Sequence, residues 1–103
     1  MTEILLQFSE RVVLSTAMQE LDRHQRFLRD ALSRARESAT QFQLVADLGQ
    51  LREVDTTVLG VLLHLDRDAR SQMGRPLLIR SASENLKSLA RLSSLESVMT
   101  WQT

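Results

Sequence analysis

The stretch from residue 42 to residue 65 restricts the possible folds of this chain more than any other part of it. Apolar side chains occupy every second position at its start, and this period of two predicts a strand with one buried face: Phe42, Leu44, Ala46 and Leu48. Gly49 ends the pattern, and from Val58 onward apolar residues recur at helical spacing. A strand followed closely by an apolar helix is the basic unit of α/β folds, so we predict a sheet covered by helices.

A polar turn with three potential helix-capping residues, Asp55, Thr56 and Thr57, lies directly before the apolar helix. The first turn of a helix has free backbone N–H groups, and the helix dipole places partial positive charge there. Negative charge is therefore favoured at this position, so hydroxyl groups presented there can receive or sense a phosphate. We expect Thr56 to lie at the centre of a functional site.

The residues before this unit predict two strands and a helix. Residues 4–8 alternate, Ser9-Glu10 supplies a turn and residues 11–14 form a second strand, so we predict an N-terminal hairpin. The first helix is predicted to begin between Thr16 and Asp22, either of which can start a capping box. Its apolar side chains share one face: Leu21, Leu28, Ala31, Leu32, Ala35 and Ala39.

The residues after it predict two more helices with a strand between them. The second helix runs from about Thr56 to Met73, and its core stripe is Val58, Leu62, Leu65, Ala69 and Met73. Pro76 to Ser81 is predicted as a strand, and Ser81 with Glu84 as the capping box of a third helix. The buried side of that helix is predicted to be Leu86, Leu89 and Ala90. Leu95 to Trp101 is predicted as a turn and a short edge strand.

The composition excludes several classes of function. A chain of 103 residues is one domain, residues 1–103, with one modest core. Its 13 basic and 13 acidic side chains cancel, which argues against non-specific nucleic-acid binding. Because it has no cysteine, it cannot contain a disulfide, a thiolate zinc site or a Cys nucleophile. No signal peptide is recognised, and the apolar run from Val58 to Leu65 is far shorter than the about 20 residues of a membrane span, so we expect a cytoplasmic protein.

The sequence predicts neither catalysis nor a cofactor nor a metal site. It contains no GxGxxG, Walker A or GxSxG motif. Its two histidines lack metal-ligand spacing: His24 is predicted at the edge of the first helix's apolar face and His64 on the outer face of the second helix. Met18 and Met99 are predicted to fill the core or to pack near the ends of the chain.

Several short segments, in a fixed order, resemble the STAS domain, a family named for sulphate transporters and anti-sigma-factor antagonists. They are Asp47-Leu48, Val54-Asp55-Thr56, Leu59-Gly60-Val61-Leu62-Leu63, Gly74-Arg75-Pro76-Leu77-Leu78-Ile79 and Leu86-Lys87-Ser88-Leu89-Ala90-Arg91-Leu92. The resemblance covers roughly residues 10 to 100 and implies an α/β fold in which a small mixed β-sheet is covered by helices. It also implies a non-catalytic regulatory domain that binds another protein.

The resemblance implies two alternative functions, and both place a protein partner at the start of the second helix. The run Val54-Asp55-Thr56, Leu59, Leu62-Leu63-His64-Leu65 is similar to the small STAS subunit of Mla-type phospholipid ABC transport systems, whose partner is the cytoplasmic ATPase. The alternative is an anti-sigma-factor antagonist, in which phosphorylation of the residue matching Thr56 breaks a complex with a kinase-like anti-sigma factor. The expected partner-binding residues are Asp55, Thr56, Thr57, Leu59, Gly60, Leu63 and His64.

Two features of the second helix bear on this choice. Val58 stands where many family members have Gly, and its branched side chain stiffens the turn, which favours the transporter alternative. Val61 and Leu63 flank the core stripe on opposite sides, so both cannot be deeply buried. Either a partner helix or the neighbouring helices of this chain cover the first turns.

Overall fold

The computed structural model describes residues 2–35 and 41–102. In chain order the elements are β1 (Thr2–Gln7), β2 (Arg11–Val12), α1 (Ala17–Ala35), β3 (Phe42–Asp47), β4 (Glu53–Val54), α2 (Thr57–Met73), β5 (Leu78–Arg80), α3 (Glu84–Leu92) and β6 (Thr100–Trp101). The strands β1, β3, β5 and β6 form one sheet in that order, and β2 pairs with β4 in a second, two-stranded sheet. The chain has the α/β fold that the sequence predicts.

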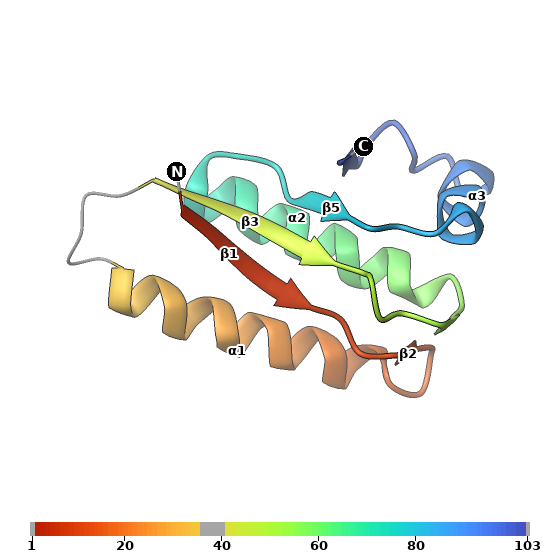
Figure 1. Ribbon diagram of the computed structural model, residues 1–103, viewed down its shortest axis with the longest axis horizontal. Helices are drawn as coiled ribbons and strands as arrows, with labels where there is room; N and C mark the ends of the chain where they lie inside the picture. Colours follow the sequence, from red (N-terminus) through yellow and green to blue (C-terminus); the bar gives the residue numbers. More distant parts are fainter. Residues whose placement is uncertain (1, 36–40, 103) are drawn as a thin grey trace.

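All pairings between these strands are parallel, and the crossovers of the larger sheet step across it in one direction. Parallel strands joined through a helix almost always have right-handed crossovers, so successive steps in one direction place their helices on the same face. In Figure 1, α2 passes behind β3 and β5 while α1 runs alongside β1. The side chains on the covered face of the sheet are buried in one cluster with apolar residues of all three helices. The strand residues on this face are Ile4, Leu6, Leu44, Ala46 and Ile79.

The predicted N-terminal hairpin was wrong, because β1 and β2 belong to different sheets. Phe8 continues the pairing of β1 with β3 by donating its N–H to the Asp47 carbonyl at 3.0 Å. The Glu10 carbonyl then accepts from the N–H groups of Arg52 at 2.7 Å and Glu53 at 2.9 Å. Because of these bonds, the chain continues in the same direction into β2, which pairs with β4, instead of reversing in a hairpin. The strands of both described sheets are therefore parallel, whereas the sequence predicted a mixed sheet.

The first two helices lie where the sequence predicts them. α1 begins at Ala17, inside the predicted window, and Ala39 of its predicted apolar face lies outside the described residues. α2 buries the predicted stripe, with Val58, Leu62, Leu65 and Ala69 fully buried and Met73 partly so. It ends at Gly74, whose left-handed φ of 69° suits a residue without a Cβ atom.

The predicted cap of α3 was wrong, because Ser83 rather than Ser81 caps this helix. The Ser83 hydroxyl accepts from the N–H of Leu86 at 3.1 Å. Ser81 has a left-handed φ of 62°, so the chain turns at the end of β5 before the helix begins. The buried side of α3 is as predicted, with Leu86 and Ala90 buried and Leu89 partly buried, and β6 forms the predicted short strand at the edge of the sheet.

Val45 lies on the open face of the sheet and is nevertheless 0% exposed. In the strand register it lies midway between Glu3 of β1 and Arg80 of β5. The side chains of those two residues form an ion pair of 2.8 Å across β3. The direct register partners of Val45 are Leu5 and Leu78, and the Glu3–Arg80 pair crosses β3 diagonally at the same position, so a residue on the more polar face of the predicted strand is buried.

A buried charged cluster fastens the end of β1 to α1. Glu20 is 5% exposed, and its carboxylate accepts from the N–H of Ser9 at 3.1 Å and from the Ser9 hydroxyl at 2.7 Å. His24 Nε2 lies 2.7 Å from the same carboxylate, and its ring stacks on Phe8 with the ring centroids 4.4 Å apart. Burial opposes ionisation of Glu20, but the hydrogen bonds from His24 and Ser9 outweigh it and lower its pKa from 4.5 to about 2. His24 therefore has a structural role in the core.

We expect Glu20→Gln to lower the free energy of unfolding at pH 7 by about 2 kcal/mol, because hydrogen bonds to a charged group are lost. The pKa of Glu20 is depressed in the folded state, so this contribution is complete above pH 4.5 and disappears as the pH falls toward 2. Urea titrations of the natural protein and the variant across this range measure it. Asp22→Asn is the control, since Asp22 lies in an exposed ion pair with Arg26 and its loss should change less than about 1 kcal/mol. A Glu20→Gln difference that does not vary with pH would contradict the assignment.

Candidate functional site

The carboxylate of Asp55 joins the turn before α1 to the start of α2. One of its oxygens accepts from the N–H of Thr57 at 2.9 Å and from the Thr57 hydroxyl. The other accepts from the N–H of Leu14 at 2.9 Å. The Thr57 hydroxyl, followed by the N–H groups of Leu14 and Thr57, holds the pKa of Asp55 below its ordinary value. Asp55 is thus the residue that caps α2, and it also fixes the position of Leu14.

Thr56 lies at this helix start without capping it. Its backbone is already helical, with φ of −64° and ψ of −16°, and its side chain makes no capping hydrogen bond. Its side chain is exposed. Of the three capping candidates in the sequence, Asp55 takes the role and leaves the Thr56 hydroxyl facing solvent above the first turn of α2.

Two large apolar side chains lie beside this helix start. Leu14, in the turn before α1, and Met18, in the first turn of α1, are each 76% exposed. The turn is held by Thr16, whose hydroxyl accepts from the N–H of Val13 at 3.0 Å. The prediction that Met18 fills the core or packs near the chain end was wrong, because helical spacing turns it away from the face that carries Leu28. Met99, by contrast, is 7% exposed, as predicted.

Two adjoining hollows run along the outer side of α2 from this point. The first has a volume of about 270 Å³ and is bounded on the α1 side by Leu14, Ala17, Met18 and Leu21, and on the α2 side by Thr57, Gly60, Val61 and His64. The second has a volume of about 250 Å³ and is lined by Gly60, Leu63, His64 and Arg67. Because Gly60 and His64 line both, we treat the two hollows as one surface and call it the α1–α2 groove.

The groove contains most, but not all, of the residues that the sequence assigns to a partner site. Gly60, Leu63 and His64 line it, Thr57 borders it, and Asp55 and Thr56 lie at its end. Leu59 is 2% exposed and belongs to the core, so we leave it out of the surface. The sequence analysis missed Leu14 and Met18, because Leu14 lies in a turn before α1 and its place beside α2 depends on the long-range bond to Asp55.

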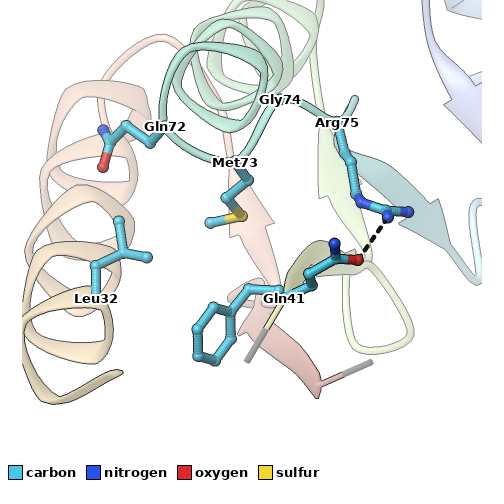
Figure 2. A pocket seen from close by; sticks show the side chains of 7 residues that line it. Leu32, Gln41, Gln72, Met73, Gly74 and Arg75 are labelled. Atoms are coloured by element: carbon cyan, nitrogen blue, oxygen red, sulfur yellow. Dashed lines mark hydrogen bonds between the residues drawn. The ribbon is translucent and has the colours of Figure 1, made fainter. Parts of the chain in front are cut away.

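A larger hollow, of about 470 Å³, lies at the opposite end of α2 (Figure 2). Leu32, Met73 and Arg75 are among its lining residues, and Arg75 donates to the side-chain oxygen of Gln41 at 3.0 Å. Gln41 directly follows residues 36–40, which lie outside the described part of the chain. We therefore base no functional site on this hollow.

A family model described as Mlab, STAS domain, matches residues 7–100. The chain belongs to the STAS domain family. STAS domains are in general non-enzymatic domains that bind other proteins. The residues that match the family model include Thr56 and the whole α1–α2 groove. None of the curated proteins compared with the chain matches it. Over residues 2–35 and 41–102, no helix is long and apolar enough to cross a membrane, and no three His, Asp or Glu side chains gather as metal ligands would.

We expect Asp55→Ala to lower the free energy of unfolding of this STAS domain more than Thr56→Ala does, because α2 loses its cap and the Leu14 N–H loses its acceptor. Thr56→Ala should change it by less than about 0.5 kcal/mol, because the Thr56 side chain makes no capping bond. Urea unfolding of the two variants provides the comparison. Equal losses in the two variants would show that Thr56 also caps the helix.

Gly60 should be replaceable by Ala without loss of stability, because a Cβ atom built there meets no other atom within 4 Å. Glycine within a helix is less stable than alanine by about 1 kcal/mol, so Gly60→Ala should raise the free energy of unfolding by up to that amount. Gly74→Ala serves as the opposite case, since its φ of 69° strains any residue with a side chain. A Gly60→Ala variant that unfolds more easily than the natural chain would indicate a close contact at this position.

Proposed function

We propose that this STAS domain is the accessory subunit that binds the ATPase of an Mla-type phospholipid ABC transporter in the cytoplasm, without catalysing a reaction itself. The observation that carries the proposal is the exposed Thr56 at the start of α2, which has no capping role because Asp55 caps the helix. A threonine that caps its own helix is held in place by that bond. Thr56 is not, so its hydroxyl is available to hydrogen-bond with a partner.

The exposure of two residues within the run 62–65 supports the same proposal. This run, Leu62-Leu63-His64-Leu65, belongs to the segment that is similar to the small STAS subunit of Mla-type systems. Leu62 and Leu65 are buried in the core, whereas Leu63 is partly exposed and His64 exposed. The two residues of the run that a partner can reach therefore lie in the α1–α2 groove beside Gly60.

We expect Thr56→Glu to weaken binding of the purified transporter ATPase by about tenfold or more, because a carboxylate would be placed where the partner surface fits a neutral hydroxyl. Thr56→Ser should bind like the natural chain, since it keeps the hydroxyl. Isothermal titration calorimetry measures both affinities. Gln72→Glu adds the same charge at an exposed position near the far end of α2 and is the control. Unchanged affinity of the Thr56→Glu variant would contradict the proposed site.

The alternative function is that of an anti-sigma-factor antagonist whose complex is controlled by phosphorylation of Thr56. The exposed, non-capping hydroxyl of Thr56 favours this alternative as well, because a kinase can reach it. A phosphate would add a charge of about −1.5 to −2 at the positive end of the α2 dipole, beside the Asp55 carboxylate. The branched Val58 in the first turn, where many STAS domains of this kind have Gly, is the reason that we place the alternative second.

The two functions differ in the class of partner, and this difference provides the test between them. Incubation with a kinase-like anti-sigma factor and ATP, followed by mass spectrometry, would detect a phosphate on Thr56 if the alternative holds. Thr56→Ala is the matched control and should remain unmodified. Modification at Thr56 together with release of the anti-sigma factor would displace the transporter proposal.

A further inference from the structure

The α1–α2 groove has an apolar wall that the fold leaves uncovered. Leu14 and Met18 are each 76% exposed and line the same hollow as Val61 and Gly60. Exposed apolar side chains that gather around a depression mark surfaces where another protein packs. The hydrogen bond from Leu14 to Asp55 holds this wall against the start of α2, so its position does not depend on a partner.

Gly60 keeps the floor of the groove open. It lies inside α2 and is the point where the two hollows meet. A Cβ atom at this position would contact nothing, so the fold does not require a glycine there. Any side chain longer than alanine would instead project into the groove, which makes this glycine a feature of the surface rather than of the core.

The shape of the groove suits a helix. Along α2 the groove extends from Thr57 to Arg67, a distance of about 15 Å, or about three helical turns. A helix that lies in such a groove presents apolar residues at a spacing of three or four positions, which matches the succession of apolar and small residues along these walls.

The far end of the groove carries a positive charge. Arg67 is exposed, and within residues 2–35 and 41–102 it is found in no ion pair. The neighbouring carboxylates are already bonded, Asp66 to Arg70 at 3.0 Å and Asp68 to the side chain of Gln25 at 3.0 Å. An occupant with a carboxylate at this end would therefore be complementary to the groove.

We infer that the α1–α2 groove receives an amphipathic helix of the partner protein, with its apolar face against Leu14, Met18 and Gly60 and an acidic residue beside Arg67. The inference rests on the proposed function, and it identifies an amphipathic helix as the part of the ATPase that binds in the groove. It assigns Leu14 and Met18, which lie on a different element from Thr56, as contacts that determine the affinity.

The affinity of the purified ATPase for groove variants is the first test. We expect Met18→Asp and Gly60→Leu each to weaken binding by about tenfold or more, since one removes the apolar wall and the other fills the groove. Phe27→Asp is the matched control for Met18→Asp, because Phe27 is 52% exposed on another side of α1. Gln72→Leu is the control for Gly60→Leu on another face of α2, and circular dichroism verifies that every variant is folded.

The identity of the occupant is tested by crosslinking. The chain has no cysteine, so Met18→Cys gives a single thiol for a photoreactive maleimide. After irradiation of the complex, we expect the crosslinked ATPase peptide to come from an amphipathic helix that contains Asp or Glu. A crosslink to a non-helical segment, or to a second copy of this chain, would overturn the inference. Arg67→Glu should weaken binding about tenfold, and an unchanged affinity would overturn the acidic contact.

The outcomes separate the inference from the proposed function. No binding of the ATPase by the natural chain would overturn both. Binding that Thr56→Glu abolishes, but that Met18→Asp and Gly60→Leu leave intact, would overturn the groove inference alone.

Discussion

The parallel pairing of β1 with β3 is the constraint on which the rest of this structure depends. It is the most extensive pairing in the described sheets and runs from Thr2–Phe42 to Gln7–Asp47. Because the chain must cross over to pair in parallel, α1 is placed on one face, and the next crossover adds α2 to the same face. The two helices of the groove are therefore neighbours because of strand direction, and the buried Glu20 cluster then fixes α1 to the end of β1.

The α1–α2 groove and the start of α2 depend on a second, smaller interaction, the shared carboxylate of Asp55. By accepting from Leu14 and Thr57 together, it caps α2 and also holds the turn before α1 against it. Thr56 is released from the capping role that threonine commonly has at a helix start. The same few hydrogen bonds thus present a hydroxyl and an apolar wall next to each other, which is the arrangement expected of a domain that binds a partner protein.

The elements of the fold could largely be predicted because their signals are local. The apolar pattern over residues 42–48 and the apolar stripe of α2 are properties of neighbouring residues, and the predicted strand and helix were both confirmed. The errors arose where distant residues decide. A turn at Ser9-Glu10 is compatible with a hairpin, but the N–H groups of Arg52 and Glu53 donate to the Glu10 carbonyl, so the chain pairs with β4 instead. Val45 was assigned to the more polar face, yet it is buried between Leu5 and Leu78 where the Glu3–Arg80 pair crosses β3.

The candidate site shows the same division between local and distant information. The sequence by itself determined the family, the α/β class and the position of Thr56 at the start of an apolar helix, because order and spacing of residues along the chain carry that information. Only the tertiary structure decided that Leu59 is buried, that Leu14 and Met18 are exposed, and that Asp55 is the cap. The physical reason is that burial and hydrogen-bond partners depend on which helix faces meet across the sheet, and residues 14 and 55 become neighbours only after the chain has folded.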